Sequence, residues 1–171
     1  MAAGALLLCG LPGRSQVLIS GYMANPASTD SPYEYTQLIA TQNIDFAATP
    51  YSVVWNNNGT ATANGWANGA ALSYKFNLTS GTVVAGEVFY VGGSGELING
   101  GGSTSLAAET WIRTINTGTT GGEGFGSSAS GGVLGNGGGN ADGIAVFNTT
   151  TVAAATVPFE AVFFGTAVVS A

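Results

Sequence analysis

Few side chains in this sequence could take part in catalysis. The chain contains no histidine, so neither a Ser-His-Asp relay nor an imidazole metal ligand can be assembled. Its single cysteine, Cys9, lies in the apolar N-terminal segment, and we expect neither thiol chemistry nor a disulfide in the mature chain. The acidic residues are scattered, and a carboxylate pair for acid–base work would need residues that meet in space, such as Glu34 and Glu109. We therefore predict that the protein is not an enzyme.

The glycine-rich stretch VLGNGGGNADGIAVFN, at Val133–Asn148, has the composition of a phosphate-binding loop but not its context. A phosphate loop needs a helix N-terminus after its glycines, whereas this stretch continues through Asp142-Gly143 into an apolar run without a lysine. Asparagine and glycine tolerate positive φ angles, so we predict a turn that leads into a strand. Calcium is the alternative, although no D-x-D-x-D-G pattern is present. The calcium candidates are Glu123, Asn136, Asn140 and Asp142, and no other cofactor is predicted.

Two of the three tryptophans are candidates for contact with a glycan or a protein partner. Trp66 stands between Asn64-Gly65 and Asn68-Gly69, which predicts that it is the most exposed of the three. Trp111 is the second candidate, because tryptophan rings form platforms for sugars. The alternative is that both rings belong to the core or to cross-strand pairs, as aromatic residues of all-β domains usually do.

The charge balance argues against polyanionic partners. Lysine and arginine occur only as Arg14, Lys75 and Arg113, and the net charge is -6. A nucleic-acid binder needs basic residues to displace counterions from phosphate. We therefore predict no nucleic-acid partner and no docking on an anionic membrane.

The N-terminal sequence MAAGALLLCGLPGRSQ has the layout of a secretory signal peptide. The apolar run Ala2–Leu11 is shorter than the about 20 residues that span a bilayer, and Pro12-Gly13 follows it. We predict cleavage after Ser15, with a signal peptide at residues 1–15 and one mature domain at 16–171. The protein would then be secreted or held at the cell surface, without membrane insertion of the mature domain. A lipid anchor at Cys9 is the alternative.

The composition favours strands and turns, because threonine, valine, glycine and aromatic residues dominate. Leu72–Leu78 alternates apolar and polar residues, which predicts a strand with one buried and one wet face. Ile144–Phe147 and Ala161–Phe164 are continuously apolar, and we predict that they are central strands joined as a hairpin. The fold class is therefore all-β, an antiparallel sandwich with a long glycine-rich insertion at Gly92–Gly132. The predicted strands are Val17–Tyr22, Glu34–Thr41, Tyr51–Trp55, Ala71–Leu78, Val88–Val91, Trp111–Ile115, Gly143–Phe147 and Val157–Phe164.

The stretch VLISGYMANP…EYTQLIATQNIDFAATPYSVVWNNNG places an apolar pair, Ile44 and Phe46, after its second predicted strand. It resembles the first strands and the apolar anchor of the lamin-tail domains found in secreted bacterial proteins. Leu78–Val91 is similar to a later strand pair, and Leu134–Gly165 to the last hairpin. The resemblance implies an immunoglobulin-like β-sandwich with a non-catalytic role as a module of exported or surface proteins.

These observations predict a structural or adhesion module that is exported or exposed on a cell surface and contacts proteins or glycans. The alternative is a carbohydrate-binding module attached to a secreted enzyme. Sticky edge strands in a chain of such low charge also predict self-association. The sequence ends soon after the last predicted strand, and we interpret it as a fragment of a longer surface protein.

Overall fold

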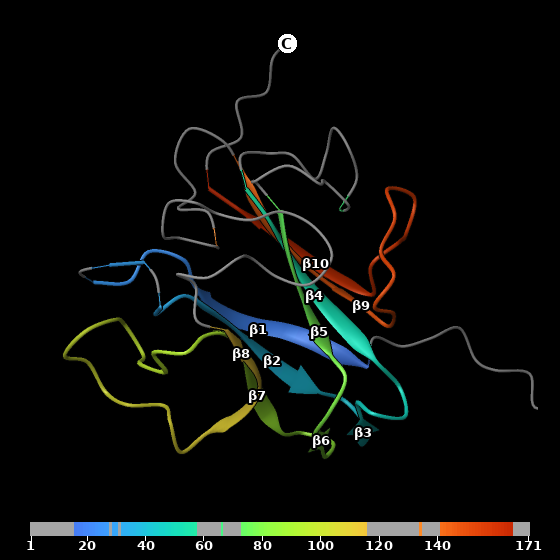
Figure 1. The fold of residues 1–171 in the computed structure, drawn as a ribbon, viewed down its shortest axis with the longest axis horizontal. Helices are drawn as coiled ribbons and strands as arrows, with labels where there is room; N and C mark the ends of the chain where they lie inside the picture. The colour runs from blue at the N-terminus through green and yellow to red at the C-terminus, as the bar shows by residue number, and fades with distance from the viewer. Residues whose placement is uncertain are drawn as a thin grey trace, which may run out of the picture.

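The computed structural model describes residues 16–27, 29–30, 32–57, 66, 73–115, 134 and 141–165. All regular structure in these residues is β-strand, and two four-stranded sheets pack face to face as a sandwich (Figure 1). The all-β prediction is therefore confirmed, and each predicted strand matches an observed one within the described residues. The strands are β1 (Val17–Met23), β2 (Tyr35–Ala40), β3 (Ile44–Asp45), β4 (Tyr51–Asn56), β5 (Ser73–Leu78), β6 (Thr82–Val83), β7 (Val88–Gly93), β8 (Thr110–Ile115), β9 (Asp142–Phe147) and β10 (Glu160–Phe164).

The first sheet has the strand order β1-β2-β7-β8 and the second has β10-β9-β4-β5, while β3 and β6 form a small two-stranded sheet. All pairs of strands are antiparallel except β7 and β8, which are parallel, so the sheets are predominantly antiparallel, in agreement with the predicted fold class. Parallel neighbours need a crossover connection. Residues 94–109 form this crossover and contain no helix. They return the chain to the end of the sheet at which β7 began.

The core lies between the two sheets and is built by alternation along each strand. Tyr51, Val53 and Trp55 of β4 point into it and are fully buried. Side chains of this size each contribute about 1.5–3 kcal/mol when fully buried. A polar contact joins the two sheets within the core, where the Trp55 Nε1–H donates to Thr36 Oγ1 at 2.8 Å. The indole therefore fills the space between the sheets without leaving its N–H unpaired.

The outer side of the second sheet is covered as well, which corrects the prediction of a wet face on β5. Tyr74, Phe76 and Leu78 point into the core as expected, but Lys75 on the opposite side is only 6% exposed. The Lys75 ammonium donates to the Thr150 carbonyl, and a second apolar cluster lies nearby on this side. That cluster consists of Val54, Trp66, Ala145 and Phe147, with Val152 packed against it.

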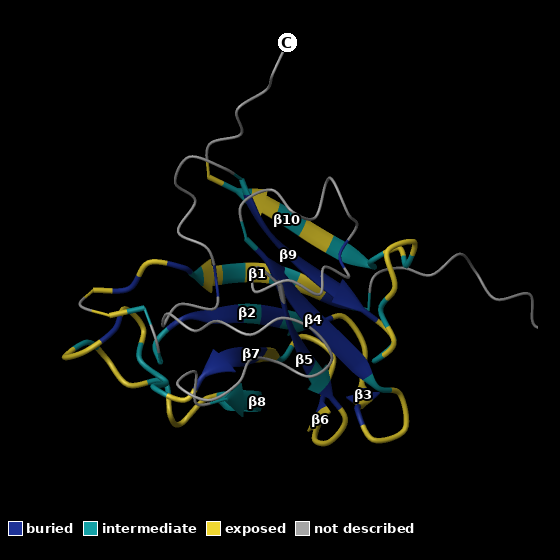
Figure 2. Cartoon of the chain, turned by 45° about the horizontal axis from the view of Figure 1, so that its top comes forward, coloured by how far each residue is buried: buried dark blue, intermediate teal, exposed yellow. Residues whose placement is uncertain are grey.

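β9 and β10 pair as the predicted hairpin, but only one of them, β9, is a central strand. β9 is central and buried along its whole length. β10 is an edge strand, so the prediction that Ala161–Phe164 is central is wrong, and Ala161 and Phe163 are exposed (Figure 2). The ring of Phe164 stacks on Tyr22 of β1, with centroids 4.3 Å apart, and this contact joins the edges of the two sheets.

No helix in the described part of the chain is long and apolar enough to cross a membrane. The predicted signal peptide at residues 1–15 lies outside the described residues. The predicted insertion Gly92–Gly132 is described only as far as Ile115. Its described part is not a separate unit, since it contributes the end of β7, the crossover and the whole of β8.

Candidate contact surface

The outer face of the first sheet carries in-register rows of side chains that cross its strands. One row crosses all four strands, and each of its residues pairs with the next one in register: Gly21 of β1, Gln37 of β2, Tyr90 of β7 and Trp111 of β8. We call these four positions the aromatic row. A second line, the aliphatic row, consists of Leu18, Ile39 and Val88.

Tyr35 joins the aromatic row to form a cluster of three rings. Tyr90 and Trp111 stack with centroids 5.1 Å apart, and Tyr35 meets both of them edge-on, at 5.6 Å from Tyr90 and 6.0 Å from Trp111. Burial raises the pKa of the Tyr35 hydroxyl, and the neighbouring Tyr90 adds to the effect. Each contact of this kind contributes about 0.5–1.5 kcal/mol beyond the area that it buries.

The crossover of residues 94–109 is attached to this cluster by two hydrogen bonds. The Tyr35 hydroxyl donates to the Ile98 carbonyl at 3.0 Å, and Trp111 Nε1–H donates to the Leu106 carbonyl at 2.9 Å. The polar atoms of both rings are therefore committed to the fold. The aromatic cluster holds the crossover over one part of the sheet, and the aliphatic row lies on another part of the same face.

Polar side chains continue the aromatic row as far as β1. Gln37 Nε2 donates to the Tyr90 hydroxyl at 2.8 Å, and the Ser20 hydroxyl donates to Gln37 Oε1 at 3.1 Å. Gly21 makes room for this amide, because a Cβ at that position would lie 3.2 Å from Gln37 Oε1. The chain of hydrogen bonds fixes the Gln37 amide across the face of β1.

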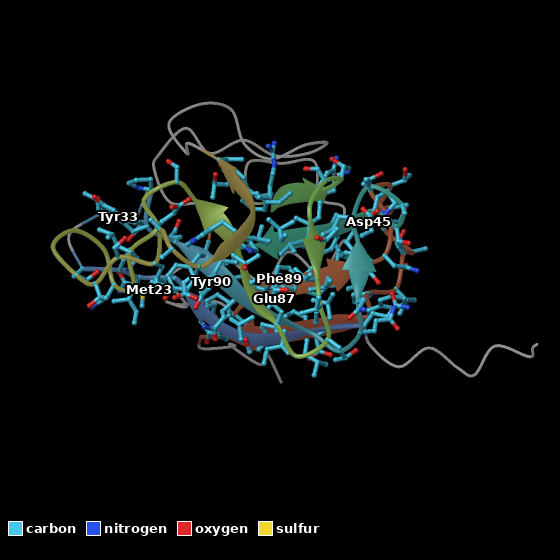
Figure 3. All side chains as sticks on the ribbon, turned by 90° about the horizontal axis from the view of Figure 1, so that it is seen from below. Met23, Tyr33, Asp45, Glu87, Phe89 and Tyr90 are labelled. Carbon is cyan, nitrogen blue, oxygen red and sulfur yellow. The ribbon has the colours of Figure 1, made fainter. Side chains whose placement is uncertain are left out.

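The aliphatic row is exposed and lies near two carboxylates. Leu18 is 40% exposed and Val88 is 36% exposed, so the row presents apolar side chains to water. Glu109 is exposed and directly precedes β8, whose first residue lies opposite Phe89, next to Val88. Glu87 is adjacent to Val88 in the chain and is labelled with Tyr90 in Figure 3.

The Glu87 carboxylate is held in place by two donors. The Val84 N–H donates to Oε2 at 2.8 Å, and the Thr110 hydroxyl donates to Oε1 at 2.7 Å. The pKa of Glu87 is lowered mainly by the hydrogen bond from the Val84 backbone, and further by the hydrogen bond from the Thr110 side chain. A carboxylate that is ionised at neutral pH therefore lies at the end of the first sheet that carries Val88.

Trp66 is not the exposed platform that the sequence predicts. It is only 7% exposed, and its ring lies 5.5 Å from that of Phe163 and 6.3 Å from that of Phe147. Asn56 Nδ2 donates to the Trp66 carbonyl at 3.2 Å. The physical reason is that the outer side of the second sheet is apolar here, so the indole covers it. Trp111, the other predicted contact residue, is half-buried on the outer face of the first sheet.

A buried carboxylate was not distinguished by sequence reasoning. Glu34 is buried, and its Oε2 accepts a hydrogen bond from the Leu134 N–H at 3.1 Å. It also acts on Tyr74, since burial and then the negative charge of Glu34 raise the pKa of that hydroxyl to about 12. The alternation of side chains along the strand could have indicated its burial. Glu34 lies two and four residues before the buried Thr36 and Leu38, so its side chain is on the same side.

Of the predicted calcium candidates, only Asp142 lies within the described residues. Glu123, Asn136 and Asn140 lie outside the described residues, and Asp142 is buried on β9, on the inward side with Ile144. Among the described residues, no group of three or more histidine, cysteine, aspartate or glutamate side chains could hold a metal ion.

Glu34 and Glu109, the candidate carboxylate pair, are not brought together. Glu34 directly precedes β2, at the end of the first sheet where β7 finishes, and it is buried. Glu109 is exposed and directly precedes β8, at the end where β7 begins. The two are separated by about the length of a strand, roughly 15 Å at ~3.3 Å per residue.

Comparison of the chain with protein-family models, with curated proteins and with solved structures finds no match.

Proposed function

We propose that this chain is a non-catalytic structural or adhesion module of an exported or cell-surface protein, and that it contacts a protein through the outer face of its first sheet. The observation that carries the proposal is the aliphatic row on the outer face of the sheet, in which Leu18 and Val88 are exposed and Ile39 between them is half-buried. Exposed apolar side chains that gather on one face are typical of interaction sites. The immunoglobulin-like arrangement and the relation to lamin-tail domains belong to the same proposal.

The hydrogen bonds of the charged side chains support a structural role for the domain. Glu34 accepts a hydrogen bond from the backbone of Leu134, and Glu87 accepts one from the backbone of Val84. Asp45 Oδ1 accepts the Ala47 N–H at 2.9 Å, and the Lys75 ammonium donates to a carbonyl of the β9–β10 connection. These side chains tie loops to strands, which is a structural use of charge.

A carbohydrate-binding module attached to a secreted enzyme is the second candidate. Trp111 is half-buried rather than fully buried, and the Ser20 hydroxyl and the Gln37 amide lie on the same face. Hydroxyl and amide groups beside an aromatic ring are a combination that suits sugars. Stacking of Trp111 on Tyr90 occupies one side of the indole, so a sugar would have to use the other side.

Binding of the fluorescently labelled domain to intact cells tests the proposal and separates the two candidates. We expect residues 16–171 to label cells of the species that encodes the chain. Protease treatment of the cells should abolish labelling if the partner is a protein, whereas periodate oxidation should abolish it if the partner is a glycan. Absence of labelling on every untreated cell sample would contradict a contact function, and hits on a glycan array would favour the second candidate.

A further inference from the structure

We infer that the aliphatic row is the docking site for a polypeptide segment in which apolar side chains are flanked by lysine or arginine. This inference rests on the proposed function and specifies the chemistry of the partner. The row runs across the strands from β1 to β7, so its length is about two interstrand spacings of ~4.8 Å each. Two or three apolar side chains of one segment are enough to cover it.

The first argument is the apolar surface itself. Leu18 and Val88 are 40% and 36% exposed, and half-buried Ile39 lies between them in register. The backbone beneath them is paired on both sides of β2, so these side chains are held on a fixed base. Covering them removes apolar area from water without requiring the sheet to rearrange.

The second argument is charge complementarity. Glu109 is exposed and has the outward parity of Trp111, whereas partly exposed Glu87 has the parity of the core residue Phe89 and lies at the rim of the sheet. Both are at the end of the sheet that carries Val88. Neither described basic side chain offsets them at this face. Lys75 is buried on the outer side of the second sheet, and Arg113 lies opposite the core residue Val91, on the inward side of β8. This end of the sheet therefore attracts cations, and such attraction raises association rates.

The same charges disfavour other occupants of this site. A second copy of the chain would bring the same carboxylates against Glu87 and Glu109, and an anionic membrane would be repelled in the same way. A sugar would find no ring and no hydrogen-bonding side chain in the aliphatic row itself. A basic and apolar polypeptide satisfies both the apolar side chains and the carboxylates.

Fluorescence anisotropy with short labelled peptides tests this inference directly. The probe alternates leucine and lysine, and the two comparison peptides alternate leucine with glutamate and serine with lysine. We expect the domain to bind the leucine–lysine peptide at least about tenfold more tightly than either comparison peptide, a difference of about 1.4 kcal/mol. Binding should weaken as salt is raised, because the carboxylates are near the surface.

Matched variants locate the site. Leu18→Ser and Val88→Ser should each weaken binding about fivefold, and Glu109→Gln should slow association and reduce the salt dependence. Val157→Ser and Glu160→Gln are the controls, because Val157 is 83% exposed on the β9–β10 connection and Glu160 is partly exposed at the start of β10. Thermal melting of every variant checks that it is folded.

The outcomes separate this inference from the proposed function. Equal binding of all three peptides, equal losses in the control variants, or no peptide binding at all would overturn the inference. If the domain still labels protease-sensitive sites on cells in those cases, the contact function stands with a partner of different chemistry. If cell labelling fails as well, the proposed function fails with it.

Discussion

At the scale of single residues, a buried hydrogen bond between Trp55 and Thr36 connects the two sheets. Trp55 is fully buried, and its indole N–H has Thr36 Oγ1 as its acceptor at 2.8 Å. Thr36 is buried on the inward side of β2, so both partners are shielded from water. A buried donor without an acceptor costs more free energy than an average hydrogen bond contributes.

Thr36→Val should therefore destabilise the domain although it preserves shape. The substitution removes the acceptor and leaves the indole N–H buried, which costs about 1–3 kcal/mol in the free energy of unfolding. Urea unfolding followed by tryptophan fluorescence measures the change. The control is Thr79→Val, because Thr79 is exposed after β5, and it should change stability by less than about 0.5 kcal/mol. Equal stability of Thr36→Val and the wild type would contradict this role for Thr36.

Tyr74 offers a residue-scale prediction about pH. Its hydroxyl is buried without a hydrogen-bond partner in the part of the chain that the structure describes, and burial with the charge of Glu34 raises its pKa to about 12. The folded pKa lies above the ordinary tyrosine pKa of 10.0, so the unfolded state loses this proton first as pH rises. The contribution is complete below pH 10.0 and is lost between that pH and about 12.

Tyr74→Phe tests both statements. At neutral pH the variant should be as stable as the wild type or more stable, since it removes a buried polar group that has no described partner. Above pH 10 its stability should fall less steeply than that of the wild type. The free energy of unfolding in urea, measured at several pH values, provides the comparison, with Tyr33→Phe at a half-exposed site as the control. A strongly destabilised Tyr74→Phe variant would show that the hydroxyl has a structural role.

At the scale of elements, local pattern was enough to locate most strands but not to arrange them. Both β5 and β9 were predicted, because their burial is visible in the local sequence. Apolar and polar residues alternate from Tyr74 to Leu78, and Ile144–Phe147 is continuously apolar. β3 and β6 were missed because two residues carry no detectable period. These short pieces are defined only by pairing between segments that are far apart in the sequence.

The errors at this scale arise from long-range contacts. β10 has a continuously apolar sequence, but Phe163 packs against Trp66 outside the sheet rather than in the main core. The same contact buries Trp66, whose polar sequence neighbours predicted exposure. The parallel direction of β8 depends on the path of the crossover, which no local pattern encodes. Of the candidate surface, the sequence therefore identified Trp111 but not the rows that surround it.

The end of β7 illustrates a constraint on an element that can be tested. A Cβ at Gly93 would lie 2.0 Å from the Pro32 carbonyl oxygen, and the Gly93 N–H donates to the Glu34 carbonyl at 2.8 Å. Gly93→Ala should lower the free energy of unfolding by about 2 kcal/mol or more, because rigid backbone would have to move. Ser94→Ala is the neighbouring control and is exposed. Urea unfolding of both variants measures the effect, and equal stability would mean that the two segments are not in contact.

At the scale of the whole molecule, two properties compete in solution. The net charge of -6 favours separate molecules, whereas the edge strand β10 exposes Ala161 and Phe163. Exposed apolar edge strands promote association between sheets, and salt weakens the repulsion that opposes it. The balance should therefore shift with ionic strength.

We predict self-association that increases with protein concentration and with salt. Ala161→Lys should reduce it, because a lysine on an edge strand opposes sheet-to-sheet pairing and Ala161 is exposed on β10. Multi-angle light scattering measures the mean mass of the wild type and the variant over a range of concentrations. A wild type that stays monomeric at high salt would contradict this role for β10.

Labelling of cells by surface variants tests the central claim, that this sandwich acts by contact through the outer face of its first sheet. The measurement is flow cytometry with three folded proteins: the wild type, Leu18→Ser combined with Val88→Ser, and Val157→Ser as a matched loss of apolar surface elsewhere. We predict that the wild type and Val157→Ser label cells equally, and that the double variant loses most of its labelling. Equal labelling by all three proteins would contradict the claim.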